Sequence, residues 1–264
     1  MRRCKIAILF SVIAAALMIS VVGYLLFLGI EESRKSYCYN SARSIGLSLA
    51  NYRDGNNGCM PPLYFKDKAT GERHSWRVLM LPNVAYAHVY GQYNFHESWN
   101  SAKNQEVAKL VANYACTTHL NSYEITNYVA VVGKKTLWQK PKTPDDIEYH
   151  TVSSANRTDV ERDFLWPNAR GAKVPRNCFS KIVIVEVVQS DIPWMEPRDI
   201  TLDEFLGEIT ENPKGRFYNK YIDGIRAIDA AGRITVIDPY DDITKIRSLF
   251  KIPDEDKGEI VDEK

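Results

Sequence analysis

The chain has 264 residues, of which 45% are hydrophobic and 25% are charged, and its 34 basic and 33 acidic residues leave a formal net charge of +1. This balance excludes the general attraction by which strongly basic proteins bind nucleic acid, so we expect no nucleic-acid partner. The length is sufficient for one large domain or two small ones, each with a sizeable core.

Residues 6–30 form an apolar stretch of 25 residues without a charge or a proline. A helix of this length spans roughly 37 Å, more than the hydrocarbon core of a bilayer, which is about 30 Å thick. Three basic residues precede the stretch and two glutamates follow it, and positive charge is retained on the cytoplasmic side. We therefore predict a single-pass anchor in the inner (cytoplasmic) membrane, with residues 1–5 as a basic cytoplasmic tip and the rest of the protein outside. A cleaved signal peptide is the main alternative, but its apolar core is shorter, about 7–15 residues.

Residues 31–52 are predicted to continue the same helix and to pack against the body. Apolar residues recur at steps of four and three, which is the spacing of one helix face. This face consists of Cys38, Ala42, Ile45, Leu49 and Tyr52. The Asp-Gly-Asn-Asn-Gly run at residues 54–58 is favoured as a helix stop, because glycine and asparagine adopt positive φ readily. A calcium loop is the alternative, but the later ligands of such a loop are missing.

The body is predicted to occupy residues 53–250, with an acidic tail at residues 251–264. We expect helices at residues 101–114, 201–206 and 241–249, and strands at residues 126–133, 181–188 and 224–238, the last a pair of strands joined at residues 230–232. Residues 134–176 are predicted to form a long surface excursion. Glu186 interrupts the strand at 181–188, where it requires a basic or hydrogen-bonding partner, because an unpaired buried charge is costly.

Four cysteines follow the predicted anchor and are candidates for one or two disulfides in an oxidising compartment. They are Cys38, Cys59, Cys116 and Cys178. Four cysteines allow three complete pairings, and the sequence does not choose among them. Their spacing does not match a zinc site or a CxxC redox motif.

The sequence contains no recognisable catalytic or cofactor motif. The five histidines lack metal-binding spacing, and no nucleophile elbow, P-loop or dinucleotide fingerprint is present. We therefore expect a protein that is not an enzyme and has no cofactor. The carboxylates of Asp238, Asp241 and Asp242 are clustered, and we favour a solvated turn over a calcium site.

Several segments, in unbroken order, resemble motifs of one large family. They are residues 38–52 (CYNSARSIGLSLANY), 58–62 (GCMPP), 74–82 (HSWRVLMLP), 93–101 (YNFHESWNS), 126–133 (TNYVAVVG) and 185–199 (VEVVQSDIPWMEPRD). This set resembles the planctomycete family catalogued as domain of unknown function 1559, whose members have prepilin-like N-termini. The resemblance implies an α+β, pilin- or pseudopilin-like fold, in which a long N-terminal helix packs on an antiparallel β-sheet. It implies no catalytic activity.

The chain departs from that family at both ends. The usual Gly-Phe-Thr processing site and its nearby Glu are replaced by MRRCKIAILF at the start, so we expect neither prepilin cleavage nor polymerisation. Near the other end, the His-x-Gly-Gly and Ala-Asp-Gly-Ser signature of the family has lost its His and its Asp. The matching positions are Tyr221, Asp223, Gly224, Ala231, Gly232 and Arg233.

The matched segments supply the residues that we expect to act in structure or recognition. They are His74, Trp76, Arg77, Asn127, Tyr128, Glu186, Pro193, Trp194, Glu196, Pro197 and Arg198. We favour a polar brace, in which an arginine satisfies Glu186 or Glu196, over a recognition surface.

The leading functional hypothesis is a non-enzymatic, membrane-anchored, pseudopilin-like envelope protein. Its expected partners are the bilayer and pilus components, type II secretion-like components or other envelope proteins. The alternative hypothesis is a membrane-tethered binding module for a glycan or calcium.

Overall fold

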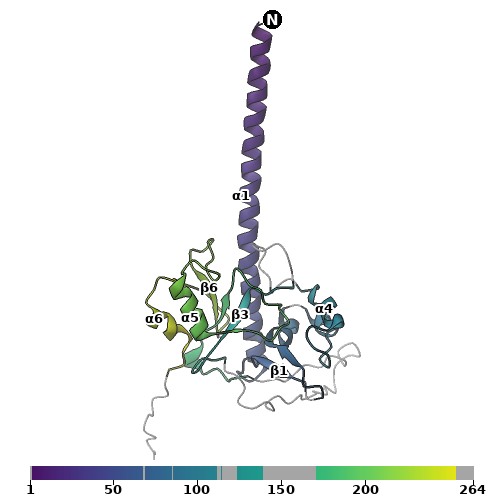
Figure 1. Cartoon of the computed structure of the whole chain (residues 1–264), viewed down its shortest axis with the longest axis vertical. Helices are drawn as coiled ribbons and strands as arrows, with labels where there is room; N and C mark the ends of the chain where they lie inside the picture. The colour runs from purple at the N-terminus through teal and green to yellow at the C-terminus, as the bar shows by residue number, and fades with distance from the viewer. Residues whose placement is uncertain are drawn as a thin grey trace, which may run out of the picture.

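The structure is a computed structural model that describes residues 2–67, 69–84, 86–111, 114, 124–138 and 171–253, with side chains described from Val12 onward. Its longest element is α1 (Arg2–Gly55), which stands out from the body as a rod with the N-terminus at its free end (Figure 1). The two predicted halves are therefore one continuous helix. From Val12 on, α1 contains a stretch long and apolar enough to cross a membrane, and none of that stretch is buried.

α1 ends where the glycine- and asparagine-rich run predicts. Asn57 and Gly58 adopt left-handed backbone angles, with φ of 57° and 83°. The amide of Gly58 donates to the carbonyl of Arg53 at 2.9 Å, which satisfies one of the free carbonyls at the helix end. The run is therefore a helix stop, as expected.

The predicted apolar face of α1 is confirmed. Cys38, Ala42, Ile45 and Leu49 are fully buried, and Tyr52 is 4% exposed. Hydrogen bonds fix the same half of α1 to the body: Ser48 Oγ donates to the carbonyl of Asn83 at 2.8 Å. We call residues 38–53 the docked half of α1 and residues 12–30 the outer half.

The principal sheet of the described residues contains β3 (Tyr128–Val132), β4 (Ile182–Glu186), β5 (Ile200–Thr201), β6 (Ile225–Asp229) and β7 (Ile234–Ile237), in the order β5-β3-β4-β6-β7. Its strand pairs are antiparallel except for β5, which runs parallel to β3. The α+β class is confirmed, and the expectation of an antiparallel sheet is wrong at this one edge. β5 has only two residues, which is too short for an alternating apolar pattern to predict a strand from the sequence.

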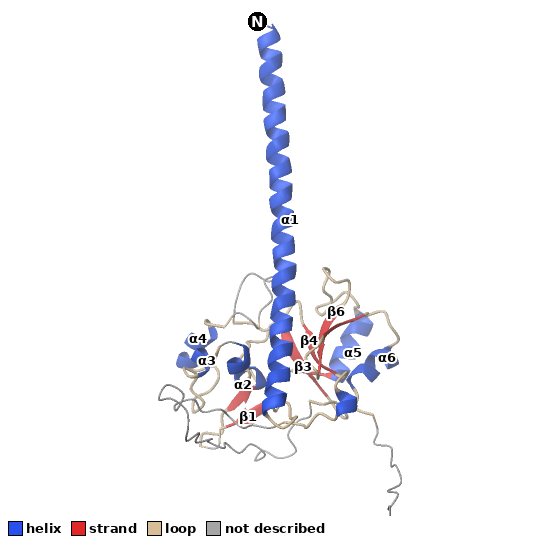
Figure 2. Cartoon of the chain, turned by 180° about the vertical axis from the view of Figure 1, so that it is seen from behind, coloured by secondary structure: helices blue, strands red, loops and turns tan. Residues whose placement is uncertain are grey.

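Helices cover both faces of this sheet (Figure 2). Tyr128, Ala130 and Ile228 face α1 and belong to the same apolar cluster as Ile45 and Leu49. On the opposite face, strand residues from β3, β4 and β6 pack with α5 (Leu202–Glu211) and α6 (Ile243–Phe250). This double coverage explains the nearly continuous apolar sequence of β4.

α5 and α6 begin with strong caps. The hydroxyl of Thr201 accepts from the amide of Glu204, and the Glu204 side chain reaches back to Thr201 as a capping box. Asp242 caps α6 by accepting the amides of Thr244 and Lys245. Asp242 therefore has a structural role, and the favoured interpretation of the acidic cluster as a turn is consistent with this cap.

Gly46 of α1 lies against Gly232 in the turn between β6 and β7. A Cβ at Gly46 would lie 2.2 Å from the carbonyl oxygen of Gly232, and a Cβ at Gly232 would lie 2.2 Å from that of Gly46. Gly232 also has φ of +84°. Beside this contact, Arg53 Nη1 donates to the carbonyl of Ala230 at 2.5 Å. The glycines thus allow the helix and the turn to meet backbone to backbone.

The remaining described elements are β1 (Tyr64–Lys66), β2 (Arg73–Ser75), α2 (Trp76–Leu79), η1 (Leu81–Val84), α3 (Ala87–Tyr90), α4 (Ala102–Ala108) and η2 (Arg176–Cys178). Of these, α2, α3, α4 and β1 lie on the other side of α1 from α5 (Figure 2). The predicted helix at 101–114 is shorter than expected and ends at Ala108. Its apolar spacing misled the prediction because Leu110 is 49% exposed while Val111 and Tyr114 are buried in the loop that follows. Most of the predicted excursion at 134–176 and of the acidic tail lies outside the described residues.

Candidate functional site

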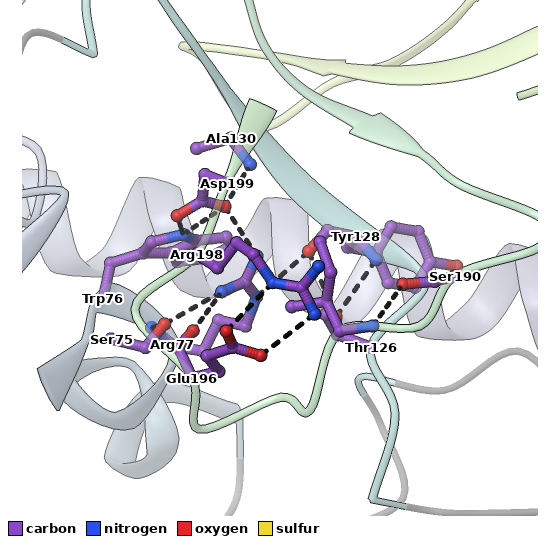
Figure 3. Close-up of polar contacts among 11 residues, drawn as sticks. Ser75, Trp76, Arg77, Thr126, Tyr128, Ala130, Ser190, Glu196, Arg198 and Asp199 are labelled. Atoms are coloured by element: carbon purple, nitrogen blue, oxygen red, sulfur yellow. Dashed lines mark hydrogen bonds and ion pairs between the residues drawn. The ribbon is translucent and has the colours of Figure 1, made fainter. Parts of the chain in front are cut away.

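The matched segments meet around Arg77, in the first turn of α2. Ser75 caps this helix: its Oγ accepts the amide of Arg77 at 3.3 Å. The cap starts the helix so that the Arg77 side chain enters the body, where it is fully buried. Figure 3 shows its guanidinium surrounded by polar groups from distant parts of the chain.

Every nitrogen of this guanidinium has a partner. Nη2 contacts Asp199 Oδ1 at 2.6 Å, and Nε donates to the carbonyl of Tyr128 at 3.0 Å. Nη1 donates to Ser75 Oγ at 2.9 Å and to the carbonyl of Glu196 at 3.4 Å. Arg77 thereby connects α2, β3 and the segment that leads into β5.

Asp199 is the partner that completes this arrangement. Its side chain is 2% exposed and accepts the amide of Ala130 at 2.7 Å and the indole N–H of Trp76 at 3.2 Å. Burial raises the pKa of Asp199, while the adjacent Arg77 and the two N–H donors oppose that shift. Because the ion pair is sealed from water and fully hydrogen-bonded, it is suited to holding segments together and not to contacting a substrate.

Aromatic residues surround the ion pair. Trp76 packs against Trp138 with ring centroids 5.3 Å apart, and Tyr114 stacks on Trp194 at 5.5 Å. The Tyr114 hydroxyl donates to the carbonyl of Arg77 at 2.6 Å, and the Trp194 indole donates to the carbonyl of Ala108 at 3.1 Å. These rings are buried, so Trp76 and Trp194 belong to the core and not to a recognition surface.

Arg198 and Glu196 lie at the exposed rim of this cluster. Arg198 Nε contacts Glu196 Oε1 at 2.9 Å, and Nη1 contacts Asp191 Oδ2 at 3.0 Å. The Arg198 side chain is 44% exposed, so solvent screens these pairs and each contributes little. The predicted pairing of an arginine with Glu196 is present, but it differs in kind from the buried pair of Arg77.

Glu186 pairs with Arg226 and not with Arg77 or Arg198, the arginines of the matched segments. Its carboxylate contacts Arg226 Nη1 at 3.3 Å and accepts from Asn219 Nδ2 at 2.8 Å, and its side chain is 1% exposed. Burial raises the pKa of Glu186, and Arg226 and Asn219 partly offset this effect. Cross-strand geometry explains the choice, because Val185 pairs with Ala227 and so Arg226 stands opposite Glu186.

His74 is a buried, hydrogen-bonded core residue. Its Nδ1 lies 2.8 Å from the Tyr93 hydroxyl and its Nε2 lies 2.9 Å from the carbonyl of Phe95. Burial lowers the pKa of His74 to about 4, so the ring is neutral at pH 7.

Asn127, Tyr128 and the two prolines complete the motif residues. Asn127 Nδ2 donates to the carbonyl of Val187 at 2.7 Å, and the Tyr128 hydroxyl donates to the carbonyl of Cys38 at 3.0 Å. Pro193 forms a single antiparallel bridge with Ile125, and Pro197 is half-buried in the segment just before β5. Tyr128 thus connects the motif cluster to the docked half of α1.

Asp199, Arg226 and Asn219 are partners of buried charges that we did not expect from the sequence. Asp199 is the last residue of the matched segment at 185–199. Its place in a family motif, next to Arg198, is the feature from which its role could have been predicted. Arg226 and Asn219 lie outside the quoted motifs, and only the strand register brings them to Glu186.

The cysteines divide into bonded and free. Cys38 is disulfide-bonded, whereas Cys59 and Cys178 carry free thiols, so neither contributes a disulfide here. Cys116 lies outside the described residues. Among those residues, no three His, Cys, Asp or Glu side chains are placed to hold one metal ion.

A family model described as a protein of unknown function (DUF1559) matches residues 31–175, which is more than half of the chain. The chain belongs to the DUF1559 family. The match includes the docked half of α1, Arg77 and Tyr128, whereas Asp199 and Glu186 lie beyond it. No curated protein and no solved structure matched the chain. Membership of DUF1559 and the apolar outer half of α1 fit a membrane-anchored envelope protein.

Proposed function

We propose that this DUF1559 protein is a non-enzymatic, single-pass, pseudopilin-like protein of the cell envelope, whose body acts through protein–protein contacts. The observation that carries the proposal is the division of α1. The outer half exposes large apolar side chains, including Leu17 (62%), Ile19 (73%) and Leu26 (63%), while the docked half is built into the body. A helix with this distribution suits a body held at a membrane surface.

The proposed topology places the N-terminus in the cytoplasm and the body outside. The basic residues before the apolar stretch and Glu31 and Glu32 after it support this orientation. The disulfide at Cys38 also supports it, because disulfides persist in oxidising compartments outside the cytoplasm.

The absence of catalysis in this proposal is supported by the state of the motif residues. Arg77, Asp199 and Glu186 are buried and paired, and His74 is neutral and bonded at both ring nitrogens. These groups are committed to contacts within the protein, so they do not provide an accessible acid, base or nucleophile.

Protein contact is supported by the free face of the docked half of α1. Tyr39 is 50% exposed and Leu47 is 60% exposed, and both lie away from the buried face. Apolar side chains on a helix that is already anchored to its own body suit packing against a neighbouring helix. We therefore assign the contact with pilus, type II secretion-like or other envelope components to this face.

Two measurements test the proposal. The full chain should remain in the membrane pellet after alkaline carbonate treatment, and protease added to the outside of spheroplasts should degrade the body. Release by carbonate or protection from protease would contradict the topology. In pull-downs from native envelope, Leu47→Glu should lose captured envelope components that the unaltered chain and a Lys103→Glu control retain. Equal capture by all three proteins would contradict the assigned face.

A further inference from the structure

The loop between α5 and β6, residues 212–224, lies at the level where the outer half of α1 ends. Lys35 Nζ lies over the Tyr221 ring, 5.8 Å from its centroid. The Tyr221 hydroxyl, by its proximity, lowers the pKa of Glu31. Glu31 directly follows Ile30, the last residue of the apolar stretch. In Figure 1 this part of the body, beside β6, lies on the side from which α1 emerges.

The loop is held firmly by the body. Asn219 and Gly224 bridge each other, with the amide of Asn219 donating to the carbonyl of Gly224 at 2.8 Å. The amide of Val188 donates to the carbonyl of Arg216 at 2.7 Å, and Asn219 also binds the buried Glu186. The position of the loop along α1 is therefore fixed by the fold.

The loop combines tyrosines with lysines, a combination typical of segments at a membrane interface. Lys214 Nζ lies 5.4 Å from the centroid of the Tyr218 ring, and Lys220 Nζ lies 4.9 Å from that of Tyr221. Both lysines lie at the protein surface. Tyrosine rings with lysines on their faces combine an apolar body with a charged tip, which is the combination that gathers at the level of lipid headgroups.

The turn after β7 lies at the same end of the sheet. Ile237, the last residue of β7, pairs with Ile225, the first residue of β6. Tyr240 follows three residues after Ile237 and is 64% exposed. A third tyrosine thus stands beside the loop.

We propose that residues 212–224, together with Tyr240, seat the body on the phospholipid headgroups of the membrane that α1 enters. If residues 6–30 occupy the hydrocarbon core, the helix turn from Glu31 to Lys35 lies in the headgroup layer. The contact of Lys35 with the Tyr221 ring places the loop there as well. The lysine ammonium groups then meet lipid phosphates, and the tyrosine rings lie at the boundary with the acyl chains. This inference rests on the proposed membrane anchoring.

The experiment places a fluorescent reporter in the loop of the full chain. Tyr221→Trp and Tyr240→Trp are reconstituted in phosphatidylcholine vesicles, with and without a nitroxide label on the lipid headgroup. The signal of the unaltered chain is subtracted from each. Tyr64→Trp is the matched control, because Tyr64 also has a cation over its ring, Arg73 at 5.1 Å, but lies on β1 at the far end of the body.

We expect the headgroup nitroxide to quench the added fluorescence at positions 221 and 240 several-fold more strongly than at position 64. Flotation and carbonate treatment of the same samples establish whether the chain is inserted. Equal quenching at the three positions in an inserted chain would overturn the seating of the loop and leave the anchor intact. A chain that fails to insert would overturn both proposals.

Discussion

The two halves of α1 have opposite relations to their surroundings. In the outer half, residues 12–30, large apolar side chains are exposed, and a Cβ added at Gly23 or Gly29 would meet no atom within 4 Å. In the docked half, small and polar residues meet individual partners, as at Gly46 and Ser48. The docked half therefore depends on the identity of each residue, whereas the outer half requires only length and hydrophobicity.

The largest effect should come from breaking the buried ion pair that supports the body around the docked half. Arg77→Met leaves the Asp199 carboxylate buried without its cation, which should lower the free energy of unfolding by about 3–5 kcal/mol. Urea unfolding of the detergent-solubilised chain, followed by tryptophan fluorescence, measures this loss. Membrane retention should not change, because the outer half is untouched.

Arg198→Met is the matched control for that variant. Arg198 pairs with Glu196 and Asp191 at the surface, so its removal should lower the free energy of unfolding by only about 0.2–1 kcal/mol. Equal losses in the two variants would show that the burial of Arg77 is not what makes its ion pair important.

A second comparison uses glycines within α1 itself. Gly46→Ala places a Cβ 2.2 Å from the carbonyl oxygen of Gly232, which should lower the free energy of unfolding by about 1–3 kcal/mol or more. Gly29→Ala meets nothing within 4 Å and should leave unfolding of the body unchanged. Thermal melts of both variants in the same detergent make the comparison, and an unchanged melt for Gly46→Ala would contradict the close contact with the turn.

A third test measures how the free energy of unfolding depends on pH. The pKa of His74 falls from its ordinary value of 6.5 to about 4 on folding, so the unfolded chain binds the proton more tightly. Its stabilising contribution is therefore present above pH 6.5 and is lost as the pH falls towards 4. At pH 5 the loss should be about 2 kcal/mol relative to pH 7.5.

Urea unfolding at pH 7.5 and pH 5 should detect this loss as the difference between the unaltered chain and His74→Gln. The comparison of the two proteins removes the contributions of carboxylates that also titrate in this range. A loss of the same size in both proteins would assign the acid sensitivity to other groups.

The smallest effect is expected on the opposite face of the sheet. Gly207 lies in α5, exposed, with nothing within 4 Å of an added Cβ. Gly207→Ala should raise the free energy of unfolding by about 0.5–1 kcal/mol, because alanine restricts the unfolded chain and favours helix. A decrease in that free energy would show that alanine destabilises the protein even where its Cβ meets no atom. The loss in Gly46→Ala could then not be assigned to the contact with Gly232.

The parts of the fold that depend on local periodicity can be predicted from the sequence. The steps of four and three from Cys38 to Tyr52 identify the buried face of α1, and the apolar run of β4 identifies a strand covered on both sides. The partners of the buried charges depend on register and tertiary contact instead. Asp199 is far along the chain from Arg77, and Arg226 is far from Glu186, so no local pattern identifies either pair. The importance of Gly46 likewise depends on its contact with Gly232. In the sequence alone, a glycine within a helix indicates only a loss of helix stability.

We infer that the outer half of α1 is retained in the mature protein as a membrane anchor. The most direct measurement is the intact mass of the protein extracted from carbonate-washed membranes, with sequencing of its N-terminal peptide. A retained anchor gives a start at Met1, or at Arg2 after loss of the methionine. A start within the first residues of the apolar stretch would indicate prepilin-type processing, and a start after residue 30 would indicate a cleaved signal sequence; either would contradict the claim.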